Sequence, residues 1–285
     1  MTDITFFNGA YLPRNQVCIS PNDRGWLLGD GVYEVTPSYG GRFLRLNRHL
    51  DRLRASLAKM RIQGVDLDAL PSASSELLER NGLLDAPRAL VYFQISRGVA
   101  PRTHAFPAPP VPPTVYGYAA PFAPRFADDA GAAVITRSDV RWSRCDIKII
   151  GLAANCIANQ EAHEAGAFEA IFVRDGMVLE GTHTNLFLVA DGVVRTAPLN
   201  NYVLPGVTRD MVLELCRGAG IPVLEESVPA TLLERCEEVF LTGTTSEVLP
   251  VVTVDGRPVG SGRPGLMTRR IRELFLEVTR STVAV

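Results

Sequence analysis

The segment "RWSRCDIKIIGLAANCIANQEAHEAG" (141–166) places a rare lysine inside an apolar run. It reads as a short strand, a loop and a helix, with Lys148 between Ile147 and Ile149. Of the 29 lysines and arginines, only Lys59 and Lys148 are lysines. Burial can bring the pKa of an amine from ~10.4 toward neutrality and make it a nucleophile, which a guanidinium cannot become. Lys148 is therefore a candidate nucleophile, although a lysine at a strand end often extends to water.

The composition narrows the class of protein. The 285 residues are 46% hydrophobic and 21% charged, with a formal net charge of -2, which is typical of a globular protein without a nucleic-acid or anionic-membrane partner. The five cysteines are scattered without a CxxC pair, which favours reduced thiols over a disulfide framework or a metal site. The start of the chain lacks signal-peptide features and no apolar run reaches membrane-spanning length. We expect a soluble cytoplasmic protein.

The apolar periodicity predicts mixed helices and strands. Hairpins are expected around Asn8-Gly9, Gly40-Gly41, Asp175-Gly176 and Asp191-Gly192. Helices are expected over 47–62 with Asn47 as N-cap, 70–82, about 153–165, after Pro205-Gly206, and 265–280. Other strands are expected within 88–98, 132–136 and 139–149.

The domain organisation follows from two irregular segments. Prolines crowd residues 101–113, which predicts a stiff, extended excursion that is neither helix nor central strand. Residues 121–131 look like a linker between a small N-terminal domain (1–120) and a larger C-terminal domain (132–285) that carries Lys148. Because the elements lack regular βαβ alternation, the expected class is α+β with two domains.

Four features could serve one site, although each also has a purely structural interpretation. Lys148 is the first, and Glu180, at the end of an apolar strand, is the second. The third is a set of possible anion-binding groups: Gly206, Val207 and Thr208 at a helix start, Gly243, Thr244 and Thr245 in a turn, and Arg52. The fourth is the pair Arg102 and His104, which period-two geometry would turn to one side as a carboxylate clamp. Together they describe pyridoxal-phosphate catalysis.

The chain resembles the fold-type IV, class IV pyridoxal-phosphate aminotransferases nearly from end to end, and within them the bacterial enzymes that act on D-amino acids. The resemblance rests on these segments: "DRGWLLGDGVYEV" (23–35), "HLDRLRAS" (49–56), "YFQISRGVAPRTHAFP" (92–107), "RWSRCDIK" (141–148), "NQEAHE" (159–164), "NNYVLPGVTRD" (200–210) and "TTSE" (244–247).

The resemblance implies a role for each matching residue. Lys148 matches the Schiff-base lysine, and Glu180 matches the carboxylate opposite the ring nitrogen. The phosphate-binding positions and the apolar side chain beside the ring are matched by the following residues: Arg52, Val207, Thr208, Thr244 and Thr245 for the phosphate, and Leu204 for the ring. Tyr33, Arg102 and His104 match the trap for the substrate α-carboxylate, with the last two supplied by the partner subunit of a homodimer. The cofactor would lie at the domain interface.

The resemblance further implies a ping-pong transamination that moves amino groups from D-amino acids to pyruvate or 2-oxoglutarate. One position departs from the family pattern, because His183 stands in a run where small hydroxyl residues are usual, so it is expected to alter the substrate pocket. The alternatives are an (R)-amine or branched-chain transaminase, an aminodeoxychorismate lyase-like enzyme, and a non-catalytic binder. The Arg102-Thr103-His104 segment favours α-amino acids over simple amines, and a retained Lys148 argues against a binder.

Overall fold

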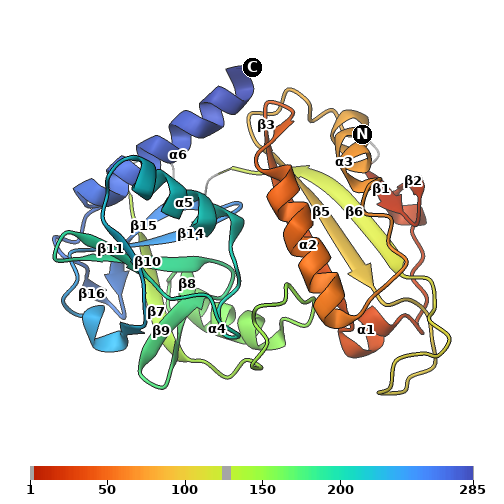
Figure 1. The fold of residues 1–285 in the computed structure, drawn as a ribbon, viewed down its shortest axis with the longest axis horizontal. Helices are drawn as coiled ribbons and strands as arrows, with labels where there is room; N and C mark the ends of the chain where they lie inside the picture. Colours follow the sequence, from red (N-terminus) through yellow and green to blue (C-terminus); the bar gives the residue numbers. More distant parts are fainter. Residues whose placement is uncertain (1–2, 124–129, 285) are drawn as a thin grey trace. The chain divides into compact units, whose positions relative to one another are not determined.

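The structure is a computed structural model that describes residues 3–123 and 130–284 (Figure 1). Its contacts divide the chain into two units, the first made of residues 3–123, 147–151 and 279–284, and the second of 130–146 and 152–278. The predicted linker 121–131 falls partly on residues 124–129, which lie outside the described residues. Lys148 was expected in the C-terminal domain, but residues 147–151 group with the first unit, because they pair with one of its strands and pack on its core.

The first unit contains a six-stranded antiparallel sheet in the order β2-β1-β6-β5-β3-β4 (Figure 1). Its elements, with the bounds of the strands first, are as follows: β1 (Ile4–Phe7), β2 (Ala10–Pro13), β3 (Gly31–Tyr39), β4 (Arg42–Phe43), β5 (Ala89–Ser96), β6 (Thr114–Pro121), η1 (Arg14–Gln16), α1 (Arg24–Leu28), α2 (Leu46–Met60) and α3 (Leu70–Arg80). The predicted hairpins at residues 8–9 and 40–41, and both predicted helices, are confirmed.

Period-two alternation along β5 explains how this sheet buries one face. Val91, Phe93 and Ile95 belong to a core that also includes Leu53 of α2 and Leu77 of α3. The intervening side chains of β5 are only half-buried, so the two faces of the sheet differ as alternation requires. The helical period of α2 and α3 presents their leucines to the same core.

One detail of α2 was wrongly predicted from the sequence. Asn47 was expected to be the N-cap, but the helix already begins at Leu46. Arg45 takes the cap position in the left-handed conformation, with φ 55°, and no side chain caps the helix. The backbone N–H groups of Arg48 and His49 donate to the Arg45 carbonyl, so the first turn closes without the asparagine.

The second unit contains a ten-stranded mixed sheet in the order β12-β11-β10-β14-β15-β7-β8-β9-β13, with β16 paired to β15. Its elements are the following: β7 (Ala132–Ser138), β8 (Glu169–Arg174), β9 (Met177–Gly181), β10 (Asn185–Ala190), β11 (Val193–Thr196), β12 (Val223–Glu225), β13 (Val228–Pro229), β14 (Glu238–Gly243), β15 (Glu247–Val254), β16 (Arg257–Pro258), α4 (Ala153–Glu164), α5 (Val207–Gly218), η2 (Ala230–Leu232) and α6 (Leu266–Ala284). The helices expected near 153–165, after residue 206 and at 265–280 are confirmed, as are the hairpins at 175–176 and 191–192.

The sheet of the second unit closes on itself. From β10 the ladder runs through β14, β15, β7 and β8 to β9, and β9 then pairs back to β10 at Glu180 and Asn185. The ring encloses an apolar core that includes Ile171, Leu186, Leu241 and Val251. The closing pair therefore consists of two polar residues at the end of an otherwise apolar barrel.

The strand expected over 139–149 is wrong. Apart from an isolated bridge between Ile149 and Val32, this segment is irregular. Its polar side chains bond locally, because Arg141 pairs with Asp139 and Arg144 pairs with Asp146. Such local bonds compete with the ladder of a sheet.

Within residues 3–123 and 130–284, no helix combines the length and apolar composition needed to cross a membrane. In the same part of the chain, no group of three or more His, Cys, Asp or Glu side chains is arranged to hold a metal ion.

Candidate active site

In the first unit, Lys148 lies against strand β3. The Tyr33 N–H donates to the Lys148 carbonyl at 3.0 Å, and the Lys148 N–H donates to the Ser56 hydroxyl at 3.2 Å. The Lys148 Nζ lies 4.2 Å from the centroid of the Tyr33 ring. The structure thus brings together the predicted nucleophile and one predicted member of the carboxylate trap.

Arg52, predicted to bind phosphate, belongs to a buried polar cluster beside this lysine. Its Nε and Nη2 donate to the two oxygens of Glu34 at 2.9 and 2.6 Å. His49 Nδ1 lies 2.9 Å from Glu34 Oε1. Burial raises the pKa of Glu34, but Arg52 and His49 together hold it well below its usual value. Burial lowers the pKa of His49, and the Arg52 and Lys148 charges add to this effect.

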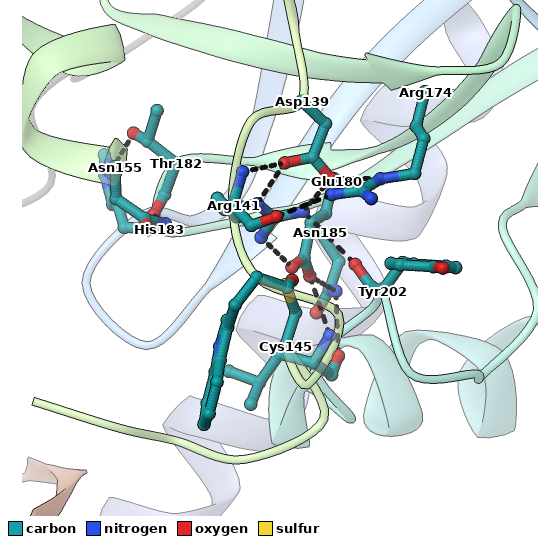
Figure 2. A network of polar contacts seen from close by, with 12 residues as sticks. Asp139, Arg141, Cys145, Asn155, Arg174, Glu180, Thr182, His183, Asn185 and Tyr202 are labelled. Atoms are coloured by element: carbon teal, nitrogen blue, oxygen red, sulfur yellow. Dashed lines mark hydrogen bonds and ion pairs between the residues drawn. The ribbon is translucent and has the colours of Figure 1, made fainter. Parts of the chain in front are cut away.

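In the second unit, Glu180 ends β9 in a socket of donors (Figure 2). Arg141 Nη1 donates to Glu180 Oε1 at 2.6 Å, while Asn185 Nδ2 and the Leu204 N–H donate to Oε2 at 3.1 and 2.9 Å. The Glu180 residue is 4% exposed. Burial raises the pKa of Glu180 to about 7, against the lowering effect of Arg141 and the Leu204 N–H. This carboxylate is therefore poised to pair with a cation brought beside it.

Arg141 is itself fixed by a second carboxylate. Its Nε and Nη2 donate to the two oxygens of Asp139 at 2.9 and 3.0 Å, and Nη2 also donates to the Tyr202 carbonyl at 3.2 Å. Burial opposes its charge, but Asp139 and Glu180 raise the pKa of Arg141 above its usual value. Arg174 donates to the Arg141 carbonyl at 2.8 Å and pairs with Asp139 (Figure 2). The orientation of Glu180 thus depends on a chain of ionic contacts.

Asn185 connects Glu180 to the first turn of α5. Its Nδ2 also donates to the Leu204 carbonyl at 3.0 Å. A Cβ at Gly206 would lie 1.9 Å from Asn185 Oδ1, so this helix start needs a glycine. No side chain caps α5, which begins at Val207 and continues with Thr208. The free N–H groups at such a helix start, together with the Thr208 hydroxyl, are suited to an anion.

The turn between β14 and β15 lies beside the same barrel end. Its Thr244 and Thr245 are half-buried. A Cβ on Gly243 would lie 3.4 Å from the Thr184 methyl group, and the neighbouring Thr242 pairs with Asn185 across the ladder. The predicted phosphate-binding residues of the second unit are therefore grouped around Asn185.

His183 lies in the turn that joins β9 to β10. Its Nδ1 lies 3.0 Å from Glu169 Oε1, and its ring is 5.6 Å from that of Phe168. Glu169 is fully buried and also accepts bonds from the Thr182 and Thr184 hydroxyls at 2.9 and 2.7 Å. Burial raises the pKa of Glu169, but these partners, His183 foremost, hold it below its usual value. His183 thus anchors the turn, and its predicted contact with substrate stays a prediction.

Arg102 and His104 are exposed in the first unit, on the proline-rich segment. The backbone there bends at residue 102 and again at 104–105 instead of forming a regular extended strand. The Thr103 N–H donates to the Pro101 carbonyl at 2.8 Å, and the Thr103 hydroxyl donates to the Ala105 carbonyl at 3.1 Å. These short-range bonds produce the bends, so the predicted period-two geometry does not describe this segment.

Sequence reasoning missed the residues that hold Glu180. Arg141 and Asn185 were not singled out, although both lie within or beside quoted segments. Arg141 stands 39 positions before Glu180, and no spacing rule connects the two. The available signal was Asn185 itself, a polar residue opening the apolar run "NLFLVA".

Comparison with known proteins identifies the family. The pattern of the amino-transferase class IV family matches residues 31–254. The chain belongs to the class IV aminotransferases. Among the curated relatives of this class IV aminotransferase, the D-alanine aminotransferase of Bacillus licheniformis is 40% identical over 271 residues, covering 93% of both chains. That of Staphylococcus haemolyticus is 36% identical and covers 95% of both.

Solved structures agree on the fold of this class IV aminotransferase. The Escherichia coli branched-chain amino acid aminotransferase superposes with a TM-score of 0.90 at 27% identity, covering 98% of this chain and 95% of the other. A branched-chain amino acid aminotransferase from T.th., solved with pyridoxamine 5'-phosphate, gives a TM-score of 0.89 at 28% identity, covering 99% and 95%. The predicted fold class, a two-domain α+β fold of type IV, is confirmed, and the enzyme is a pyridoxal-phosphate-dependent transferase.

The side chains fit what this cofactor requires. Its aldehyde calls for an amine, its ring nitrogen for a buried carboxylate and its phosphate for free backbone N–H groups. Lys148 supplies an amine, Glu180 a buried carboxylate and the uncapped start of α5 the N–H groups, in a place where Gly206 leaves no room for a side chain.

Proposed function

We propose that the chain transfers amino groups from D-amino acids to 2-oxo acids such as pyruvate and 2-oxoglutarate. The observation that carries the substrate class is the 40% identity, over 93% of both chains, to a relative named D-alanine aminotransferase. The geometry that carries the chemistry is the buried Glu180 held by Arg141, Asn185 and the Leu204 N–H. Bound pyridoxal phosphate supplies the electron sink that makes the α-proton of the substrate acidic.

The proposed catalytic role of Lys148 is to bind the cofactor through its Nζ and, once released from it, to carry the proton at the substrate α-carbon. Contact with the Tyr33 ring at 4.2 Å would hold this amine against β3 during the transfer. Glu180 would keep the ring nitrogen protonated, because a carboxylate favours the cation beside it. Arg141 and Asp139 would fix the direction of that carboxylate.

The cofactor phosphate would be held by residues from both units: Arg52, Val207, Thr208, Thr244 and Thr245. Leu204 would lie beside the ring. Tyr33 would bind the substrate carboxylate with Arg102 and His104 of the partner subunit, so the functional form would be a homodimer. His183 would border the side-chain pocket. We further propose a cytoplasmic location.

The test compares half-reactions of the cofactor-loaded enzyme. D-Alanine, D-glutamate, L-leucine and (R)-1-phenylethylamine are mixed with it in parallel, and the loss of visible cofactor absorption is followed. We expect the D-amino acids to react fastest. The second candidate, a branched-chain aminotransferase, is favoured by solved branched-chain enzymes with TM-scores of 0.90 and 0.89. A faster reaction with L-leucine than with either D-amino acid would select it.

A further inference from the structure

A buried cluster of two arginines and one aspartate lies under the segment that carries Arg102 and His104. Arg24 is 2% exposed, Arg97 6% and Asp30 7%. Arg24 Nε and Arg97 Nε both donate to Asp30 Oδ2 at 2.8 Å, and Arg97 Nη2 donates to Oδ1 at 2.9 Å. Burial would raise the pKa of Asp30, but the two arginines hold it below its usual value.

The cluster carries one more positive charge than its own aspartate neutralises, and the remaining donors are spent on backbone carbonyls. Arg24 Nη1 donates to the Thr103 carbonyl at 2.7 Å. Arg97 Nη2 and Nη1 donate to the carbonyls of Met60 and Arg61, at the end of α2, at 2.7 and 3.0 Å. Bonds from a charged donor are stronger than neutral ones, so the contact to Thr103 is a firm attachment.

A second attachment lies three residues further along the segment. The guanidinium carbon of Arg97 lies 3.5 Å from the centroid of the Phe106 ring. The base of the segment is also closed, because a Cβ at Gly98 would lie 2.0 Å from the Pro112 carbonyl oxygen. Arg102 and His104 therefore project from a segment held on both sides, at Thr103 and at Phe106.

We infer that Arg24, Asp30 and Arg97 are positioning residues for the substrate-carboxylate clamp. The guanidinium of Arg24 is a rigid fork whose Nε is fixed by Asp30 and whose Nη1 is fixed on Thr103, the residue between the two clamp side chains. Asp30 directly precedes β3, the strand that carries Tyr33. The cluster thus joins the strand of one carboxylate ligand to the segment of the other two. This inference rests on the proposed function.

Arg24→Met is the informative variant, because it leaves the Asp30–Arg97 pair intact. We expect it to raise the KM for D-alanine by about 10-fold while kcat changes little, since displacing a clamp by a fraction of an ångström weakens carboxylate binding. Arg24→Lys keeps the charge but loses the fork, so it should resemble Arg24→Met. A normal KM in Arg24→Lys would show that charge alone matters and would overturn a positioning role.

A double-mutant cycle tests whether Arg24 acts through the clamp. Arg102→Leu should raise the same KM, and adding Arg24→Met to it should raise the KM by less than the product of the two single effects. If Arg102→Leu raises the KM and Arg24→Met does not, or if the effects multiply, the inference fails and the proposed function stands. If Arg102→Leu leaves the KM unchanged, the clamp itself is refuted, and the inference with it.

A readout independent of activity is trypsin cleavage after Arg102 in the cofactor-loaded enzyme, followed by the mass of the fragment that ends there. We expect Arg24→Met to accelerate this cleavage, because the Thr103 carbonyl is released, and Phe106→Leu to do so less strongly with the core cluster untouched. Arg54→Met is the matched control, since Arg54 is an exposed arginine of the same unit paired with Asp51. Equal cleavage in the wild type, Arg24→Met and Phe106→Leu would overturn the inference.

Discussion

Glu180→Gln isolates the effect of burial on the carboxylate at the centre of the site. Burial raises the pKa of Glu180 from its ordinary 4.5 to about 7. Below pH ~4.5 the side chain is protonated in both the folded and unfolded states. As the pH rises toward 7 the unfolded chain loses this proton while the folded chain keeps it, so the free energy of unfolding falls. The separation of the two pKa values corresponds to roughly 3.4 kcal/mol.

The assay is urea unfolding of the cofactor-free protein at pH 5, 6, 7 and 8. We expect the stability of the wild type, relative to Glu180→Gln, to fall by roughly 3 kcal/mol across this range, because glutamine does not titrate. Glu225→Gln is the matched control in the same unit. Burial raises the pKa of Glu225, but Arg209 and Arg217 hold it below its usual value, so it stays ionised throughout this range in both states. Parallel pH profiles for the wild type and Glu180→Gln would refute the argument and show that the donors outweigh burial.

The same variant has a catalytic consequence. A glutamine keeps the size of the side chain and can still accept the Leu204 N–H, while Arg141 keeps both its bonds to Asp139. The fold should therefore persist. Without a negative charge beside the ring nitrogen, we expect turnover to fall on the order of 10²–10³-fold, the usual effect of losing one electrostatic partner in an active site. Turnover within a few-fold of the wild type would remove Glu180 from the proposed role.

Three further substitutions test other parts of the site. Lys148→Ala should fold normally and lose multiple turnover and the visible absorption of the bound cofactor, and sustained turnover without an added amine would contradict the assignment. Arg52→Met should reduce the free energy of unfolding by ~3–5 kcal/mol, because it leaves Glu34 buried without its cation; urea unfolding measures this, and a loss typical of an exposed arginine would contradict it. Gly206→Ala should weaken cofactor retention on dialysis and reduce stability by ~1–3 kcal/mol, since its Cβ would meet Asn185 Oδ1 at 1.9 Å; unchanged retention would contradict the anion-binding role of this helix start.

The elements that could be predicted from the sequence are those with a local signal. Each predicted two-residue turn, such as Asn8-Gly9 and Asp175-Gly176, has positive φ at both positions, and the side chains that tolerate this conformation are visible in the sequence. Helix starts marked by Pro205-Gly206 were found for the same reason. Lys148 could be singled out because lysine is so rare in this chain.

What the sequence could not show depends on partners that are distant along the chain. Arg141 makes a poor strand residue and looked ordinary until its contacts with Asp139 and Glu180 were known. Arg24 and Arg97 stand 73 positions apart, yet they share one aspartate. Asn47 was taken as a cap on the basis of residue type, whereas the left-handed Arg45 that replaces it has no marker in the sequence.

The pairing of Glu180 with Asn185 has a consequence beyond catalysis. β9 and β10 follow one another along the chain, yet this is the one residue pair by which their described residues join in the ladder. The backbone seam of the barrel and the side-chain bond from Asn185 to the catalytic carboxylate therefore occupy the same place.

Architecture and chemistry cannot vary independently at such a seam. A substitution that retunes the carboxylate also loosens the closure of the sheet, and a slip in the register of the seam would turn Glu180 to the opposite face. Directed evolution toward new donors should therefore leave these two positions unchanged and accumulate substitutions elsewhere, where a side chain can change without opening the barrel.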